Sequence, residues 1–402
     1  MNPRRFVNLF ILLSAITLAA LPAEAGQFIV SGTLLYEDGD PLPTLGLATS
    51  FSRPARLVRI TVEDDDEDVF GQGHTDSAGR FQIAVRAPDD EPLRVLAEVD
   101  NFALELFANT DGWNDRFRLL IDDLPAGHAS DVALGTLPVA ARYHAVRIHE
   151  ALPVLPLDVL SYDTVLSFAA ALNVNETILQ AHAIAETNRD PGETDTIGQV
   201  TVEYCDPVAS RYFLDMVLSC ARIDGAVNPE NPSGLDQAFV DTTVAHEYAH
   251  HLQYEVGAWD GHWEDHDNCV ENDSILNNDP EIAWSEGFAD FFAEHVVTQG
   301  DRLSKKEQTI AGNVEAGCQS PVFVSGDDER FLAVEGNVIA ALWDLTDGLG
   351  TGLDSWDRVG GTVDGGRGFR SIFQIFDNEL DTWDAPDLID FYDAVASRPG
   401  VV

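Results

Sequence analysis

The chain has 402 residues, 45% of them hydrophobic, and its 69 Asp and Glu against 23 Lys and Arg give a net charge of −46. This much apolar material can form cores, which excludes wholesale disorder, and the length allows two or three domains. A surface this acidic repels phosphate backbones and anionic lipids, so neither nucleic acid nor a membrane surface is an expected partner.

The N-terminus has the layout of a secretory signal peptide. Two arginines precede an apolar run over residues 6–21, and the small residues Ala23 and Ala25 follow it. The run is shorter than the about 20 residues that a spanning helix needs, and no second stretch is long enough. We therefore expect residues 1–25 to be removed and the protein to be secreted, extracellular or periplasmic, with an uncleaved anchor as the alternative.

Export changes the interpretation of the four cysteines, because an even number in an oxidising compartment favours two disulfides. Three pairings are possible, and proximity in the sequence favours Cys205–Cys220 and Cys269–Cys318. No Cys-x-x-Cys spacing occurs, so a zinc site built from thiolates is not expected.

Residues 26–139 are predicted to form an all-β sandwich, because short β-type runs alternate with turn residues. The clearest runs are 28–30, 57–62, 81–85 and 93–99, and Asp76 to Gly79 has the residue preferences of a type I turn.

Three phrases in this segment, Val30-Ser31-Gly32-Thr33, Gly39-Asp40-Pro41-Leu42 and Thr75-Asp76-Ser77-Ala78-Gly79-Arg80-Phe81, resemble the carboxypeptidase regulatory-like (transthyretin-like) domain. The resemblance implies a non-catalytic β-sandwich module beside an enzyme or receptor.

An acidic run, Glu63 to Asp68, lies between two of the predicted strands. Its carboxylates could bind Ca²⁺, which prefers hard oxygen ligands, or the run could be a solvated acidic loop.

Residues 140–160 are predicted to be a proline-broken linker, and residues 161–402 a second, α+β domain that is mainly helical in its C-terminal part. Helical spacing covers residues 163–180, and residues 199–203 and 211–223 alternate like strands.

The first residues that carry chemistry form a His-Glu-x-x-His motif. It occupies residues 246–250 within a stretch of helical periodicity over 237–256. On a helix, positions i and i+4 share a face, so His246 and His250 can bind one ion. Glu247 would then lie beside the ion, where it can take a proton from water.

A catalytic zinc site needs a third protein ligand and an open fourth position. The metzincin pattern would require Gly at 253 and His at 256, but the chain has Gln253 and Val256, which excludes that class.

A second predicted helix supplies a better third ligand. Asp279 is a plausible N-cap, Pro280 suits the first helical position, and apolar spacing continues to about Val297. Glu286 and Asp290 are again four residues apart on one face. Glu286 can ligate the metal, and Asp290 can accept the second N–H of a ligand imidazole.

His-Glu-x-x-His on one helix and Glu-Gly-x-Ala-Asp on the next resemble the gluzincins, the thermolysin-like zinc metallopeptidases, over roughly residues 140–395. The resemblance implies a zincin-like fold with His246, His250 and Glu286 as zinc ligands, Glu247 as general base and Asp290 behind a ligand histidine.

The chain departs from thermolysin in spacing, because Glu286 follows His250 by 36 residues. The intervening segment 257–279 is predicted to be an inserted loop that a disulfide holds to Cys318. This departure weakens the assignment to a subfamily more than the assignment to the class.

Alternatives remain open. The two motif histidines could be hydrogen-bonded core residues, with His251 structural or exposed off the ligand face. A second cluster in the inserted loop could supply the third ligand, bind Ca²⁺ or be solvated: His262, Asp265, His266 and Asp267.

The downstream helices offer few further site residues. Residues 335–345 and the regions around 372 and 388 are predicted helices. Gluzincins usually supply a downstream His or Tyr as oxyanion donor, and only His295 and Tyr392 follow Glu286, so that role stays unassigned. The aromatic residues of the second helix are expected in the core: Trp284, Phe288, Phe291 and Phe292.

The sequence therefore predicts a secreted zinc metallopeptidase of the gluzincin type acting on a peptide or protein substrate. The alternative is a non-catalytic extracellular binding protein whose metal site is structural or degenerate.

Overall fold

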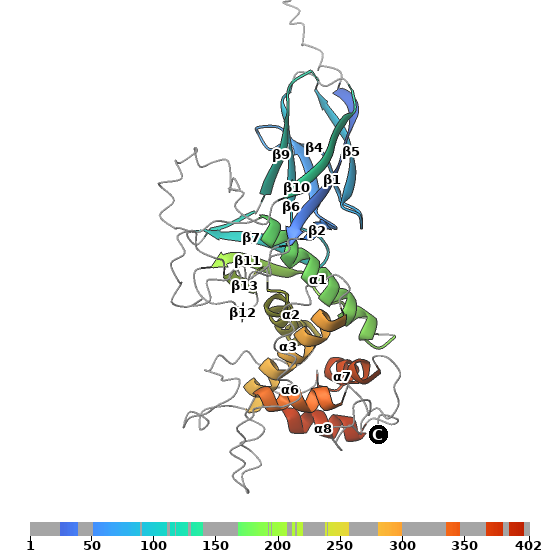
Figure 1. The fold of residues 1–402 in the computed structure, drawn as a ribbon, viewed down its shortest axis with the longest axis vertical. Helices are drawn as coiled ribbons and strands as arrows, with labels where there is room; N and C mark the ends of the chain where they lie inside the picture. Colours follow the sequence, from blue (N-terminus) through green and yellow to red (C-terminus); the bar gives the residue numbers. More distant parts are fainter. Residues whose placement is uncertain are drawn as a thin grey trace, which may run out of the picture.

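The computed structural model of the chain describes residues 25–38, 51–88, 91–110, 113–116, 118–127, 130–139, 168–191, 193, 195–206, 211–213, 215–219, 238, 240–256, 280–299, 335–345, 367–380 and 386–397. The N-terminal part is rich in strands and the C-terminal part is helical, as predicted (Figure 1). No described helix combines the length and apolarity that crossing a bilayer requires.

Two four-stranded sheets form the N-terminal part. The first contains β1 (Ala25–Asp38), β2 (Phe51–Pro54), β5 (Arg80–Pro88) and β10 (Val132–Val139). The second has the order β4 (Val69–His74), β3 (Arg59–Glu63), β6 (Leu93–Glu98) and β9 (Arg118–Leu124). Buried side chains alternate along β5, and both sheets contribute to one apolar core, which accounts for the period-two pattern in the sequence.

The structure tests two local predictions made from the sequence of these sheets. The predicted strand over 57–62 begins only at Arg59, because Leu57 has a φ of 52°, which a strand cannot accommodate. The predicted turn at Asp76 is confirmed: the Asp76 carboxylate accepts the backbone N–H groups of Ala78 (2.8 Å) and Arg80 (2.9 Å). Gly79 closes the turn with a φ of 73°, a conformation that glycine adopts at no steric cost.

A third sheet joins the two halves of the sequence. Its order is β12 (Arg211–Phe213), β13 (Asp215–Ser219), β11 (Val200–Asp206), β7 (Leu104–Thr110) and β8 (Trp113–Arg116). Strand β7, from the segment predicted as the N-terminal domain, pairs in parallel with β11, and Leu104 lies opposite Val200. The two predicted domains therefore share a sheet. The boundary at 139/140 stays a prediction, and the linker 140–160 lies outside the described residues.

Helix α1 (Phe168–Asn188) is buried along most of its length and connects the N-terminal sheets to the helical part (Figure 1). Its Glu176 receives two hydrogen bonds from the Arg56 guanidinium, at 2.7 and 2.6 Å. The neighbouring Asn175 donates to the Arg56 carbonyl (2.7 Å) and accepts from Asn101 (2.7 Å). Side chains from two N-terminal loops thus hold one turn of α1.

The same region of α1 also holds the start of α2 (Asp241–Val256). The Asp241 carboxylate is 1% exposed and accepts hydrogen bonds from Asn173 (2.8 Å) and Thr177 (3.0 Å). A negative charge in the first turn also interacts favourably with the helix dipole. The position of α2 therefore depends on α1.

Helix α3 (Pro280–Gln299) packs against α2 and against α6 (Glu335–Asp344), and α7 (Arg367–Asn378) and α8 (Leu388–Ser397) complete the far end of the molecule (Figure 1). All four of these helices were predicted. The aromatic residues of α3 belong to the core as expected: Trp284 stacks on Phe391, with ring centroids 5.2 Å apart, and Phe288 stacks on Phe376 at 4.1 Å.

Gly287 lets α6 approach α3 closely. A Cβ atom at this position would lie 2.6 Å from the Val338 Cβ and 3.0 Å from the Glu335 carbonyl oxygen. Both distances are well below ordinary van der Waals contact, so the glycine of the Glu-Gly-x-Ala-Asp motif is required by packing.

Candidate metal centre

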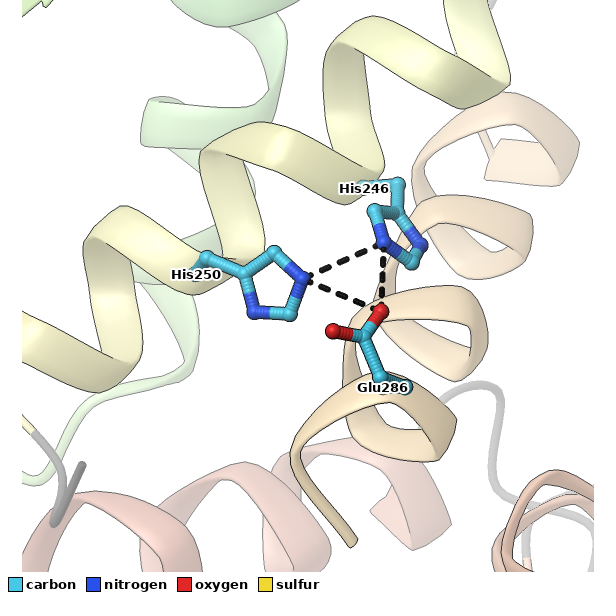
Figure 2. A group of neighbouring side chains, drawn as sticks. All are labelled: His246, His250 and Glu286. Carbon is cyan, nitrogen blue, oxygen red and sulfur yellow. Dashed lines mark hydrogen bonds and ion pairs between the residues drawn. The ribbon is translucent and has the colours of Figure 1, made fainter. Parts of the chain in front are cut away.

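Helices α2 and α3 lie side by side and carry the two predicted metal-binding motifs (Figure 1). His246 and His250 are one turn apart on α2, and Glu286 projects toward them from α3 (Figure 2). The 36-residue separation between His250 and Glu286 does not prevent this meeting. The intervening residues 257–279 lie outside the described part of the chain.

Three side-chain atoms converge on one point. The Nε2 atoms of His246 and His250 are 3.1 Å apart, and the Glu286 Oε2 atom lies 3.1 Å from the first and 3.3 Å from the second (Figure 2). Across the described ranges, this is the one group of three or more His, Cys, Asp or Glu side chains with metal-site spacing.

Each histidine uses its other ring nitrogen for a hydrogen bond. His246 Nδ1 lies 2.6 Å from the Asp290 Oδ1 atom, as the sequence predicted for Asp290. His250 Nδ1 lies 2.7 Å from the Gln253 Oε1 atom. Because both partners are acceptors, both Nδ1 atoms carry protons, so each imidazole, in its neutral form, directs an Nε2 lone pair at the convergence point.

This donor set fits zinc. Two imidazole lone pairs and a carboxylate oxygen at such short separations repel one another unless a positive charge lies between them. Tetrahedral coordination at about 2.0–2.2 Å would separate the ligand atoms by about 3.3–3.5 Å, close to the distances observed. Hard oxygen sites for Ca²⁺ or Mg²⁺ would not use two imidazoles.

The pKa shifts of the cluster residues also indicate that a positive charge is stabilised at this point. Burial opposes the charged form of His246, but the Asp290 and Glu286 carboxylates outweigh it and raise the pKa of this imidazole well above its usual range. Burial likewise opposes ionisation of Glu286, yet the two histidines hold the pKa of its carboxyl well below the ordinary value. A site with these shifts is stabilised by a cation, either a proton or a metal ion.

Glu247, the predicted general base, is buried on α2 next to the first histidine, with 5% of its surface exposed. Its charge is among the influences that raise the pKa of His250, after the opposing effect of burial and the larger effect of Glu286. The carboxylate therefore acts electrostatically on the cluster.

His251 points away from the cluster. It is 2% exposed, and its Nε2 atom contacts the Gly198 carbonyl oxygen at 3.0 Å. It is a structural residue, as expected from its place off the ligand face. His295, considered as an oxyanion donor, is also buried and stacks on Phe369.

The sequence did not identify Gln253 as part of the site. The sequence showed only that position 253 lacks the glycine that a metzincin would have there. Its spacing of three residues from His250, on the same helix face, is the signal that could have pointed to it.

The acidic run begins at Glu63, the last residue of β3, and its buried side chains have partners within the protein. Glu63 accepts hydrogen bonds from Arg94 (3.1 Å) and Arg118 (2.5 Å), and Asp64 accepts the backbone N–H groups of Asp66 and Asp68. These contacts explain the local structure of the run without a calcium ion, and Ca²⁺ binding there stays a prediction.

Other predicted site residues lie outside the described part of the chain. They are the signal peptide up to residue 24, the loop cluster His262, Asp265, His266 and Asp267, and Cys220, Cys269 and Cys318. The side chain of Cys205, in β11, is also outside it. Both predicted disulfides therefore stay predictions.

Comparison with known proteins supports a peptidase relationship. Residues 235–380 match the family model described as the mycolysin C-terminal domain, a segment that contains α2, α3, α6 and α7. The match indicates a peptidase-related protein, and both metal-binding motifs fall within it.

A longer similarity covers most of the chain. A protein from Archaeoglobus fulgidus, described as uncharacterized, is 28% identical over 356 residues, which cover 84% of this chain and 92% of that protein. A match of this length must include strands of the N-terminal part as well as helices α2 and α3. Among solved structures, a 9R-lipoxygenase from Cyanothece PCC8801 is 20% identical with a TM-score of 0.18. The match covers 42% of this chain and 25% of the lipoxygenase chain.

Proposed function

We propose that the protein is a secreted zinc metallopeptidase of the gluzincin type that hydrolyses bonds in a peptide or protein substrate. The observation that carries the proposal is the triangle of His246, His250 and Glu286 ligand atoms, with all separations between 3.1 and 3.3 Å. The match to the mycolysin C-terminal domain over the same helices supports a peptidase. Secretion rests on the predicted signal peptide over residues 1–25.

In this proposal the two histidines and Glu286 hold the ion, and Asp290 fixes the orientation of His246 by accepting its Nδ1 proton. A bound zinc ion would supply Lewis acidity toward a peptide carbonyl and lower the pKa of a water molecule. Glu247, next to His246 on α2, would accept the proton of the attacking water and deliver it to the departing amine.

The number of ligands that the described part of the chain supplies is the number typical of a catalytic site and not of a structural one. Structural zinc sites are closed by four protein ligands, whereas catalytic sites use three and leave one position for water or substrate. In the described part of the chain the cluster consists of three side chains, two from α2 and one from α3. The hydrogen-bonded Asp290 lies behind His246, on the side of Nδ1.

The test separates metal binding from catalysis. Zinc content and digestion of a peptide library should be measured for the full-length protein and for Glu247→Gln, each with and without a chelator. We expect both proteins to bind one zinc ion, and only the unmodified protein to cleave peptides, in a chelator-sensitive manner. Undiminished cleavage by Glu247→Gln would reject its role as general base. Zinc binding with no cleavage of any peptide by the unmodified protein would favour a binding protein with a structural metal site.

A further inference from the structure

Gln253 connects the second histidine of the cluster to the helix that carries Glu286. The side chain is 1% exposed and extends from α2 toward α3. Its Oε1 atom lies 2.7 Å from His250 Nδ1, and its Nε2 atom donates to the Ser285 carbonyl oxygen at 3.0 Å. The Ser285 hydroxyl donates to the same Oε1 atom, also at 3.0 Å.

These contacts permit only one orientation of the amide. If the amide were flipped, Oε1 would face the Ser285 carbonyl oxygen, and two acceptors would meet without a proton between them. The Nε2 group would also face the Ser285 hydroxyl and the His250 Nδ1–H. Since Oε1 must therefore point at His250, the histidine donates from Nδ1 and keeps the lone pair on Nε2.

The contacts also link two ligands across the helix pair. Ser285 immediately precedes Glu286, so the amide that orients His250 is bonded to the backbone of the residue before the third ligand. A shift of α2 relative to α3 would break the contacts of Gln253 to Ser285 before it separated the ligands widely. The hydroxyl itself is 3.5 Å from His250 Nδ1, too long to replace the amide as acceptor.

We infer that Gln253, held by Ser285, is the positioning residue that fixes the tautomer of His250 and its place relative to Glu286, and so sets the zinc affinity of the site. The inference rests on the proposed function. It gives His250 a neutral amide partner, in contrast to the carboxylate Asp290 behind His246. The two ligand histidines are thus held by side chains of different charge and from different helices.

The test measures zinc affinity of the full-length protein by competition with a chromophoric chelator, together with thermal unfolding of the metal-free forms. Gln253→Leu keeps the approximate size of the side chain and removes the acceptor, and it should weaken zinc binding about 10–100-fold. Gln253→Glu restores an acceptor for Nδ1–H, and in its protonated form it can also donate to the Ser285 carbonyl oxygen as the amide does, so it should bind zinc more tightly than Gln253→Leu. Ser285→Ala should weaken binding only a few-fold, because the backbone contact remains.

A merely structural role predicts the opposite order for the first two variants, since a buried leucine packs better than a buried carboxylate. Metal-free Gln253→Leu should indeed unfold at a temperature equal to or above that of Gln253→Glu while binding zinc less tightly. Gln180→Leu, the same change on α1 at an amide oxygen without a hydrogen-bond partner among the described residues, is the matched control and should bind zinc normally.

The outcomes are separable. If the unmodified protein does not bind zinc, the proposed function fails. If it does, the inference is overturned when Gln253→Leu binds as tightly as the unmodified protein, or when Gln253→Glu is no better than Gln253→Leu. If Gln253→Leu does not fold, comparison of Gln253→Glu and Ser285→Ala with the unmodified protein decides: unchanged affinity in Ser285→Ala would remove the support that the inference assigns to the serine.

Discussion

Glu294 is predicted to make the stability of the protein fall as the pH rises. The side chain is 2% exposed on α3, one turn after Asp290. Burial, assisted by the Asp290 carboxylate, raises the pKa of Glu294 from 4.5 to about 7. Between these values the native state holds a proton that the unfolded chain releases, so the free energy of unfolding decreases as the pH rises through this window.

The size of the effect follows from the pKa difference. Each unit corresponds to about 1.4 kcal/mol, so the easier ionisation of Glu294 in the unfolded chain should lower the free energy of unfolding by about 3 kcal/mol at pH 8 and about 1 kcal/mol at pH 5. Glu294→Gln removes the ionisation and keeps the shape. The variant should therefore gain stability over the unmodified protein, and the gain should be about 2 kcal/mol larger at pH 8 than at pH 5.

Urea unfolding of both proteins at pH 5 and pH 8, in the presence of a chelator, measures the difference. Asp393→Asn, which removes an exposed carboxylate from α8, gives the baseline for loss of one charge from a very acidic chain. A stability gain that is the same at both pH values would refute the argument, because a pH-independent effect reports packing and not ionisation.

Three further predictions concern the supports of the metal centre. Asp290→Asn should weaken zinc binding about 10–100-fold, measured by chelator competition, because the first histidine loses its carboxylate acceptor. Gly287→Ala should lower the urea midpoint and zinc affinity together, since the new Cβ meets Val338 at 2.6 Å; overpacking of this kind costs about 1–3 kcal/mol, and an unchanged midpoint would contradict it. Arg56→Met should destabilise the protein by about 3–5 kcal/mol in urea unfolding, because Glu176 is left buried with its ion-pair partner removed. Restoration of stability by the added change Glu176→Gln would confirm the cause.

The helices that carry the candidate site could be predicted because their signals are local. Apolar residues at helical spacing indicated the helix from Pro280 onward, and the structure extends it only two residues past Val297. The i and i+4 spacing put each pair of site residues on one face before any tertiary structure was known. That the two faces meet depends on packing, which the motif resemblance suggested and periodicity alone could not.

The sheet pairing and the role of Gln253 could not be read from local pattern. The parallel pairing of β7 with β11 joins segments almost a hundred residues apart, and a parallel pair has no connecting turn to signal it. The spacing of Gln253 from His250 is local, but the contacts that fix its amide come from Ser285 on α3, which local pattern does not indicate. Leu57 is a third case, because an apolar residue in a β-type run gave no sign of its positive φ.

One turn of α1 links the N-terminal sheets to the helix that bears the histidines. Within residues 173–177, Asn175 and Glu176 bind N-terminal loops, while Asn173 and Thr177 bind Asp241 at the start of α2. Removal of the N-terminal strands would take away Arg56, the ion-pair partner of the buried Glu176. It would also take β7 out of the sheet that contains β11. The N-terminal part is therefore built into the support of α2, which argues against its being a pro-segment that is released to free an independently folded peptidase.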